Sequence, residues 1–168
     1  RRIERTQERS FTVLDPDTSA TADSYAAAVR AAGGTIEATE AVLSGGYPAA
    51  FAFVRPPGHH AEAGQARGFC LFNNVAIAAR YLQMEHGIRR VGIVDFDVHH
   101  GNGTQAIFEE RSDVLFLSIH GDPMEAFPYF LGGADEIGEG RGEGMTRNVP
   151  LAEGSDDDIV CPAFEGAL

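Results

Sequence analysis

The chain has 168 residues, 43% of them hydrophobic, so it is long enough to bury the core of one globular domain. Acidic residues outnumber basic ones by 25 to 13, and the formal net charge is -12. This balance disfavours a surface that tracks nucleic-acid phosphates, and it suits a solvated acidic surface or a cationic substrate. No window approaches the roughly 18 apolar residues of a membrane helix, so we expect a cytoplasmic protein without a membrane partner.

The first part of the chain is expected to be mostly helical. Residues 1–10 are charged and aperiodic, which is typical of a loop. An alanine-rich run with apolar residues at helical spacing predicts one long helix, or two stacked ones, from Ser19 or Thr21 to Ser44. Two glycines follow directly and are expected to end it.

A strand and a second helix are predicted next. Residues 49–54 (AAFAFV) have no charged side chain, which is typical of a strand buried on both faces of a parallel sheet. A helix over about residues 74–86 would begin at an N-cap, Asn73 or Asn74.

The remaining elements complete an alternating pattern. Apolar strands are predicted at 91–95 and 113–120, with a short helix over 101–110 between them. Residues 121–154 are glycine-rich and aperiodic, so we interpret them as a long functional loop. A last helix begins near 155 and runs to the end. Strands that alternate with helices indicate β-α-β units and a parallel sheet, an α/β fold.

The strand at 91–95 leads into a cluster of metal-ligand side chains, in the sequence VGIVDFDVHHGNG (residues 91–103). In a continued strand, Asp95, Asp97 and His99 would share one face because the side chains alternate. Oxygen and nitrogen donors two residues apart suit a divalent cation of zinc type.

Polar side chains follow all three predicted strands. His59 and His60 follow the first, residues 95–100 the second, and residues 118–120 end the third. Ligands of parallel α/β sheets collect outside the carboxyl ends of the strands. One buried histidine is usually a core residue, but this convergence predicts a functional site.

The order of these motifs resembles the zinc-dependent histone deacetylase superfamily. The motifs are RPPGHHA (55–61), GFC (68–70), NN (73–74), DFDVHHGNG (95–103) and SIH (118–120). Asn102, where some members have aspartate, and the GDP and FPYF stretches after His120 are similar to the class II and bacterial acetylpolyamine amidohydrolase branches. The resemblance implies a three-layer αβα fold with a parallel sheet, arginase/deacetylase-like and incomplete in this chain.

The resemblance also implies roles for single residues. Asp97 and His99 would bind zinc, and His59 and His60 would face the water on the metal. His60 would be the general base, since a near-neutral pKa lets an imidazole take a proton and return it to the leaving amine.

A second group of residues would support the first. Asp95 would orient His59, and Asn102 would orient His60. A structural potassium ion would lie behind the zinc, held by oxygen atoms only, as a hard cation requires. Its ligands would be Asp95, the Ser118 hydroxyl and the carbonyls of Asp97, His99 and Ile119. A second potassium position maps to the carbonyls of Phe108, Arg111 and Val114.

The substrate is expected to be a small cationic acylated amine or an acyl-lysine. Gly68, Phe69 and Phe127 match the walls of the family's narrow tunnel, where aromatic faces would clasp the stem. Core packing is the alternative for Phe127. Nucleic acid is not expected as a direct partner, and homo-oligomerisation is left open.

The family's third zinc ligand, an aspartate, and its catalytic tyrosine have no match in this sequence. We therefore expect residues 1–168 to be the central part of a single deacetylase domain, without its first strand and C-terminal strands, and not competent alone. An arginase-type binuclear manganese hydrolase is one alternative, although the tandem histidines argue against it. The other is a non-catalytic domain that binds an acyl group or a partner.

Overall fold

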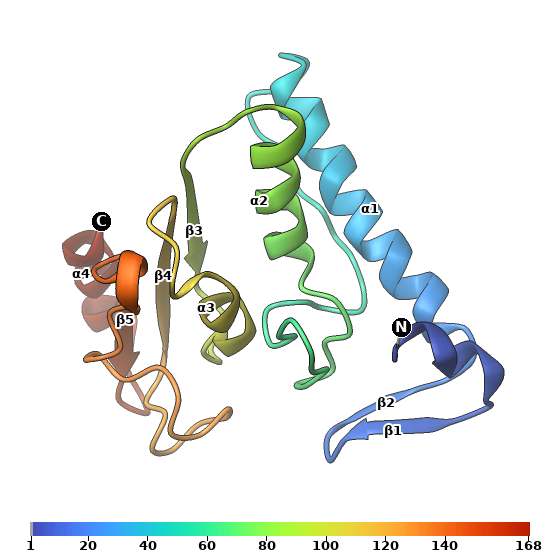
Figure 1. Ribbon diagram of the computed structural model, residues 1–168. Coiled ribbons are helices and arrows are strands. Elements are labelled where there is room, and N and C mark those ends of the chain that lie inside the picture. Colours follow the sequence, from blue (N-terminus) through green and yellow to red (C-terminus); the bar gives the residue numbers. More distant parts are fainter. Residues whose placement is uncertain (1) are drawn as a thin grey trace. The chain divides into compact units, whose positions relative to one another are not determined.

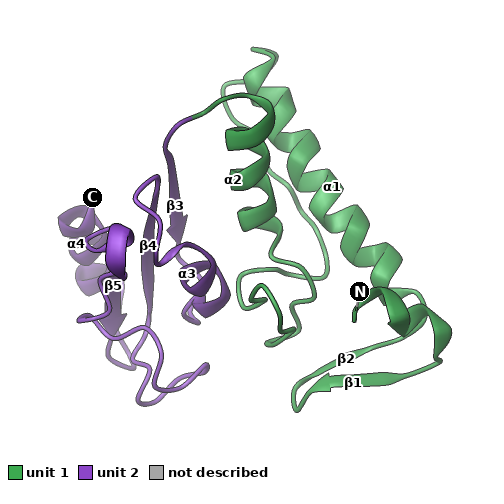
Figure 2. Ribbon diagram, in the orientation of Figure 1, with its two compact units in different colours: residues 1–88 green, residues 89–168 purple. Residues whose placement is uncertain are grey.

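The computed structural model describes residues 2–168 and consists of two compact units, residues 1–88 and 89–168 (Figure 2). Each unit has its own architecture. The first is built from helices and a small hairpin, and the second from a parallel sheet with helices (Figure 1).

The first unit is a pair of helices with a hairpin at one end (Figure 1). Its elements are η1 (Glu4–Glu8), β1 (Thr12–Asp15), β2 (Thr18–Ala20), α1 (Ser24–Leu43) and α2 (Asn74–Glu85). Helix α1 packs against both α2 and η1. The core is small and consists of Leu14, Ala20, Ala28, Ala66 and Leu71. The helices themselves bury mainly alanines, at 28, 31 and 32 of α1 and at 76, 78 and 79 of α2, and such small side chains bury little apolar surface.

The two predicted helices of this unit are confirmed, and the largest shift of boundary is at the start of α1. Helix α1 is continuous and is followed by Gly45 in the left-handed region, with φ 74°. It begins at Ser24 and not at residue 19 or 21, because residues 18–20 pair with β1 as strand β2. At α2, Asn73 is the N-cap, and its side chain accepts a hydrogen bond from Ala76 N at 3.0 Å.

The predicted strand at 49–54 is wrong. No regular element and no strand pairing in residues 2–168 includes this segment. Phe51 and Phe53 are 86% and 94% exposed, and their rings stack on each other with centroids 6.2 Å apart. An apolar run becomes a strand only when a neighbouring strand satisfies its backbone groups, and here none does.

The second unit is a three-stranded parallel sheet in the order β3-β4-β5. Its elements are β3 (Val91–Asp95), α3 (Asn102–Phe108), β4 (Val114–Gly121), η2 (Gly140–Gly142), β5 (Thr146–Leu151) and α4 (Asp157–Ala167). The strand at 91–95 is therefore confirmed with the same bounds. The strand at 113–120 and the short helix between the two strands are confirmed with ends shifted by one or two residues. Strand β4 is central and is almost entirely buried.

Helices lie on both faces of this sheet, as the α/β prediction requires (Figure 1). On one face, Phe116 of β4 lies near the ring of His100, just before α3, with centroids 6.2 Å apart. On the other, Ile119 borders a cavity that is also lined by Val160 and Phe164 of α4. Burial of both faces explains why β4 is a continuous apolar run.

The prediction of one long loop from 121 to 154 is wrong, because it contains β5. Arg147, Asn148 and Pro150 make this strand look like a loop, yet it pairs with β4 over its full length. The last helix is confirmed and begins at Asp157, with Asp156 as N-cap. At its other end, the carbonyl of Gly166 accepts a hydrogen bond from Arg147 at 2.7 Å.

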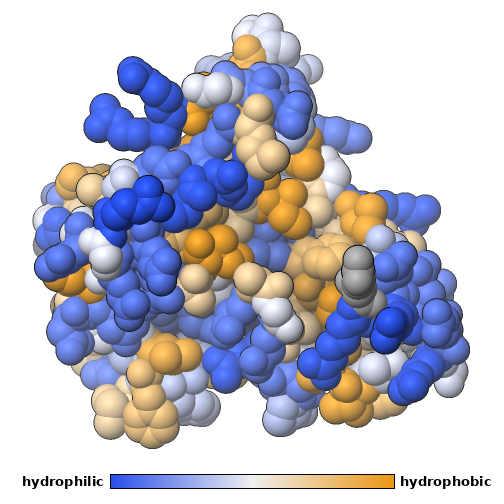
Figure 3. Space-filling view, viewed as in Figure 1, coloured by the Kyte–Doolittle hydropathy of each residue, from blue (hydrophilic) through white to orange (hydrophobic). Residues whose placement is uncertain are grey.

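No helix within residues 2–168 is long and apolar enough to cross a membrane. Hydrophilic side chains are prominent on the face in Figure 3, with hydrophobic ones interspersed among them.

Candidate functional site

The tandem histidines lie on an irregular loop of the first unit. The rings of His59 and His60 are adjacent, with centroids 3.9 Å apart and an interplanar angle of 42°. The loop is fixed to α2, because Asn74 donates a side-chain hydrogen bond to the carbonyl of Pro56 at 3.1 Å. Gly58 is required at this contact, since a Cβ there would lie 2.5 Å from the backbone nitrogen of Asn74.

A tight turn at Gly68 and Phe69 supports His60. Both residues have positive φ, 56° and 64°, and a Cβ on Gly68 would lie 2.2 Å from the His60 ring. The turn of the β1-β2 hairpin holds it: Gly68 N donates to Asp17 Oδ1 at 3.1 Å and Phe69 N donates to the Thr18 hydroxyl at 3.0 Å. Backbone in a sparsely populated region that is held in this way is typical of functional sites.

In the second unit, the chain bends immediately after β3 ends at Asp95. Asp95 Oδ1 accepts a hydrogen bond from Asp97 N at 3.1 Å, and Asp97 Oδ1 accepts one from His99 N at 2.8 Å. These local turns replace strand geometry. The prediction that Asp95, Asp97 and His99 share one strand face is therefore wrong, since Asp97 and His99 lie beyond the strand.

The turns bring the two predicted zinc ligands together. His99 Nδ1 lies 3.3 Å from Asp97 Oδ1, and both side chains are about half exposed. In a tetrahedral site with bonds of about 2.0–2.1 Å, donor atoms are roughly 3.3 Å apart, so this pair fits one zinc ion. Phe127 lies edge-on to the His99 ring at 6.0 Å. Within residues 2–168, no group of three or more His, Cys, Asp or Glu residues could hold a metal ion.

Behind this pair, the sheet places polar side chains in one row. Asp95 of β3 is in register with Ser118 of β4, and Ser118 is in register with Asn148 of β5. Ser118 is fully buried. A Cβ on Gly101 would lie 2.2 Å from Asp95 Oδ2, so only glycine allows this approach. A hydroxyl beside a carboxylate fits a hard monovalent cation, which binds oxygen ligands.

The chain from 96 to 100 is attached to the neighbouring strand. Gly121 N donates a hydrogen bond to the carbonyl of Val98 at 2.8 Å. The residues of the second predicted potassium position, Phe108, Arg111 and Val114, lie where α3 leads into β4. There, Arg111 N donates to the carbonyl of Phe108 at 2.8 Å.

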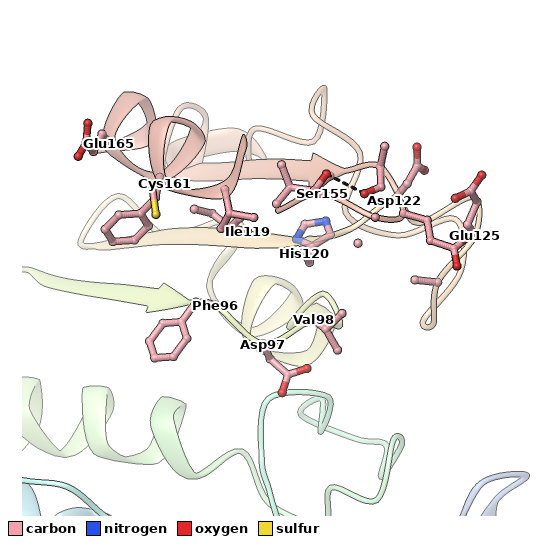
Figure 4. Close-up of a pocket in the computed structure, with 18 residues that line it drawn as sticks. Phe96, Asp97, Val98, Ile119, His120, Asp122, Glu125, Ser155, Cys161 and Glu165 are labelled. Carbon is pink, nitrogen blue, oxygen red and sulfur yellow. Dashed lines mark hydrogen bonds between the residues drawn. The ribbon is translucent and has the colours of Figure 1, made fainter. Parts of the chain in front are cut away.

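A cavity of about 820 Å³ lies beside Asp97 in the second unit (Figure 4). Much of its wall comes from the ends of β4 and β5 and from α4, with Cys161 and Glu165 on the helix side and Asp122 and Glu125 on the other (Figure 4). His120 also borders it. A mostly apolar cavity with carboxylates at its edge can accept an apolar group that carries a positive charge.

Comparison with known proteins decides the family. The profile of the histone deacetylase domain matches residues 1–168. The chain belongs to the histone deacetylase family. Acetylpolyamine amidohydrolase 1 of Pseudomonas aeruginosa is 48% identical over 160 residues, which are 95% of this chain and 46% of that protein. The acetylpolyamine amidohydrolase of Mycoplana ramosa is also 48% identical, over 76% of this chain and 37% of its own length.

The fold comparison agrees with this family. The crystal structure of an acetylpolyamine aminohydrolase from Burkholderia pseudomallei matches 98% of this chain and 56% of its own, with a TM-score of 0.86 and 34% identity. The histone deacetylase homologue of Aquifex aeolicus matches with a TM-score of 0.80 and 35% identity. The predicted arginase/deacetylase-like α/β fold and the acetylpolyamine branch of the family are thus confirmed. The chain spans about half or less of the length of these relatives.

For this member of the histone deacetylase family, the predicted residues gather in two sets. His59 and His60 lie with Gly68 in the first unit. The second set, in the other unit, comprises Asp95, Asp97, His99, Asn102, Ser118, Ile119 and Phe127. The orientation of His59 by Asp95 and of His60 by Asn102, and the clasping of one stem by Phe69 and Phe127, stay predictions.

The sequence interpretation missed a buried polar network around the second set. Gln105 Oε1 lies 3.0 Å from His100 Nε2 and accepts a hydrogen bond from Asn148 at 2.8 Å. Gln105 Nε2 donates to Glu136 Oε2 at 2.5 Å. The ring of His100 packs on that of His120, with centroids 4.6 Å apart. Glu136 and Asn148 fall in the predicted long loop, so the sequence does not predict their hydrogen bonds to Gln105 of α3 or the pairing of Asn148 with β4.

Burial determines the protonation of this network. It lowers the pKa of His100 from 6.5 to about 4, and it also lowers the pKa of His120. For Glu136, burial acts to raise the pKa, but hydrogen bonds from Gly133, Gln105 and Gly132 outweigh it and lower the pKa overall. The histidines are therefore neutral and Glu136 is ionised at neutral pH.

Proposed function

We propose that this chain forms part of a zinc-dependent amidohydrolase, which hydrolyses the amide bond of an acylated amine such as an acetylpolyamine or an acetyl-lysine. The observation that carries the proposal is the 3.3 Å approach of Asp97 Oδ1 and His99 Nδ1 after a parallel strand. Relatives named acetylpolyamine amidohydrolase and histone deacetylase support it.

Asp97 and His99 would hold the zinc ion. When bound, zinc supplies a Lewis acid that acidifies water and polarises the amide carbonyl. His60 is the candidate general base: a ring nitrogen would take the proton from water and deliver it to the leaving amine. The ring is 4% exposed and packs on Gly68, which limits its movement. His59 lies beside it and would share the same face of the site.

The substrate stem would lie against aromatic rings. Phe69 is 65% exposed on its turn, and Phe127 lies edge-on to His99. An exposed aromatic ring and a second ring beside a candidate zinc ligand suit an alkyl chain that carries a cation. The net charge of -12 favours a polyamine over a neutral acyl compound.

A potassium ion behind the zinc is the second part of the proposal. Asp95, the Ser118 hydroxyl and the carbonyls of Asp97, His99 and Ile119 would be its ligands. The register of Asp95 with Ser118 supports it, as does the Gly121 to Val98 hydrogen bond that holds the carbonyls of residues 97–99 near the end of β4.

The proposal is tested in the intact protein by metal analysis together with hydrolysis of N-acetylputrescine and an acetyl-lysine peptide. We expect one zinc per chain, loss of zinc in D97A and H99A, and loss of turnover with zinc retained in H60A. A zinc-loaded wild type that hydrolyses neither substrate would contradict the proposal. Two manganese ions per site would instead favour the arginase-type alternative.

The isolated residues 1–168 are expected to turn over poorly even with zinc added. Asp97 and His99 supply two protein donors, whereas a catalytic zinc site generally uses three. Hydrolysis by these residues alone at the rate of the intact protein would contradict this part.

A further inference from the structure

Three arginines border a cavity at the start of the first unit. Helix η1 packs against α1 and leads into β1 (Figure 1, near the label N). Side chains of η1 and β1 border a cavity of about 930 Å³. Its lining includes Arg2, Arg5, Thr6, Glu8, Arg9 and Thr12. Among the described lining residues, three positive charges stand against one carboxylate, although the whole chain carries a net charge of -12. The cavity is therefore a local positive site on an acidic protein.

The guanidinium groups have donors to spare. Arg5 and Arg9 are exposed, and within residues 2–168 neither side chain makes an ion pair or a hydrogen bond. Arg2 is partly fixed, because its Nη2 donates to the carbonyl of Leu14 at 3.0 Å. A guanidinium carries five N–H donors in a planar fork, so this one contact leaves most of them for a ligand.

A hydroxyl without a partner borders the same cavity. Thr12 Oγ1 is buried and has no hydrogen-bond partner in the part of the chain that the structure describes. The Thr6 hydroxyl, by contrast, donates to the carbonyl of Ile3 at 2.7 Å. Buried hydroxyls are normally hydrogen-bonded, so the unpaired one indicates that a further group completes this site.

The backbone that carries these groups is held in place without a ligand. Thr6 is 1% exposed, and its backbone nitrogen donates to the carbonyl of Ile3 at 3.0 Å. Arg9 N donates to the Thr6 carbonyl at 3.1 Å. On the other side, Thr12 is paired with Ala20 in the β1-β2 hairpin. Donors on two fixed elements can bind one ligand with a small loss of conformational entropy.

Guanidinium forks and a hydroxyl are the donor set that suits a small oxyanion. Arginine binds phosphate oxygens bidentately, through charge-assisted hydrogen bonds that are stronger than neutral ones. A phosphate offers more acceptor oxygens than a carboxylate, so it can engage several arginines at once. Glu4 and Glu8 of η1 limit the positive region to the cavity, whereas nucleic acid requires an extended basic surface.

We propose that the cavity between η1 and β1 binds a small phosphate-type oxyanion, held by its three arginines and by the Thr12 hydroxyl. The inference goes beyond the proposed amidohydrolase and does not depend on it. The bound anion ties η1 to β1, the strand that precedes the hairpin turn bonded to Gly68 and Phe69. It therefore stiffens the part of the first unit that supports His60.

The test is the thermal unfolding of the intact protein at increasing sodium phosphate, with ionic strength kept constant by sodium chloride. A ligand that binds only the folded state raises the melting temperature, and the dependence on its concentration gives the dissociation constant without any assay of activity. Glycerol 2-phosphate is titrated in parallel. Tighter binding of the free ion or of the ester identifies the source of the ligand, and either result supports the inference.

Four variants locate the anion. We expect Arg5→Gln and Arg9→Gln each to raise the dissociation constant about five- to tenfold, since each removes charge-assisted contacts. Thr12→Val keeps the shape of the side chain and should raise it about three- to tenfold. Glu8→Gln should lower it about two- to fivefold, because it removes a carboxylate from the lining.

Arg30→Gln is the matched control. It removes one positive charge at an exposed position of α1 in the same unit, away from the cavity lining. The dissociation constant should stay at the value of the wild type, because salt screens distant surface charges. An equal effect of Arg30→Gln and Arg5→Gln would mean that net charge alone attracts the anion, which overturns the inference.

The other failures are distinct. A wild type that phosphate stabilises no more than chloride overturns the inference. Stabilisation that is unchanged in Arg5→Gln and Arg9→Gln also overturns it, because the anion then binds elsewhere. Hydrogen exchange of the wild type gives an independent answer should a variant fail to fold. Protection by phosphate within residues 4–15 supports the inference, and protection only outside this range overturns it. None of these outcomes alters the proposed amidohydrolase.

Discussion

The two units fix their candidate site residues by different means. In the first, His59 and His60 sit on a loop held from outside by Asn74 and by the turn at Gly68. In the second, the strand register places Asp95 and Ser118, and a buried network fixes their neighbours. The first arrangement depends on backbone shape and glycine, the second on hydrogen bonds without water. Substitutions should therefore affect the two units differently.

The largest effect is expected from Gly68→Ala in the first unit. The new Cβ would overlap the His60 ring at 2.2 Å on backbone with φ 56°. The histidine must move, and a displacement near 1 Å costs on the order of a hundredfold in kcat/KM. Steady-state hydrolysis of N-acetylputrescine by the intact protein measures this. Gly64→Ala is the control, since its Cβ would meet nothing within 4 Å, and equal losses in both variants would contradict the prediction.

Next in size is Glu136→Ala in the second unit. It removes the acceptor for Gly132 N, Gly133 N and Gln105 Nε2 and leaves partly buried donors unsatisfied. We expect a loss of about 1–3 kcal/mol in the free energy of unfolding, measured with urea. Glu139→Ala, at an exposed position of the same loop, serves as the reference. If both variants are equally stable, the network does not stabilise the unit.

Acidic pH should lower the stability of the two units by different amounts, with a smaller effect than the substitutions above. The folded pKa of His100, about 4, lies below its ordinary 6.5, so the unfolded chain binds more protons and stability falls as the pH drops from 6.5 towards 4. In the first unit, hydrogen bonds from Tyr81 and His86 lower the pKa of Glu40 below 4.5, so that its contribution is lost only at lower pH. Hydrogen exchange at pH 7.5 and 5 should show loss of protection in β4 but not in α1. The reverse order would contradict these assignments.

The smallest effect is expected from Glu40→Gln. Glu40 of α1 accepts hydrogen bonds from Tyr81 and, at 2.7 Å, from His86, and so links α1 to the end of α2. The carboxylate is exposed to solvent, which weakens its interactions. We expect a slight fall in melting temperature at pH 7 compared with Glu37→Gln, at an exposed position of the same helix. An unchanged melting temperature would show that α1 and α2 are held by packing alone.

Some elements of this fold could be predicted from the sequence and others could not. Strand β3, strand β4 and the N-cap Asn73 were predictable because periodicity and capping are local. The segment 49–54 has the same local character, but a strand also needs a partner, which local pattern cannot reveal. Strand β5 was missed because its sequence is polar although it has a partner strand. Asn148 of β5 is buried and donates a hydrogen bond to Gln105 inside the core.

The candidate site divides in a similar way. Spacing alone predicted that Asp97 and His99 would come together, although turns and not a strand do this. The network of His100, Gln105 and Glu136 joins residues up to 36 positions apart, and no short motif contains it. Only tertiary structure makes such long-range polar contacts visible.

The two cysteines offer a practical route to observe the second unit. Cys70 is fully buried and its thiol donates to the carbonyl of Gly68, whereas Cys161 is exposed and borders the cavity beside Asp97. Within residues 1–168, a thiol-reactive fluorophore would therefore label one position without mutagenesis. Its emission would report when an apolar compound enters the cavity, which makes this face of the protein directly accessible to ligand screening.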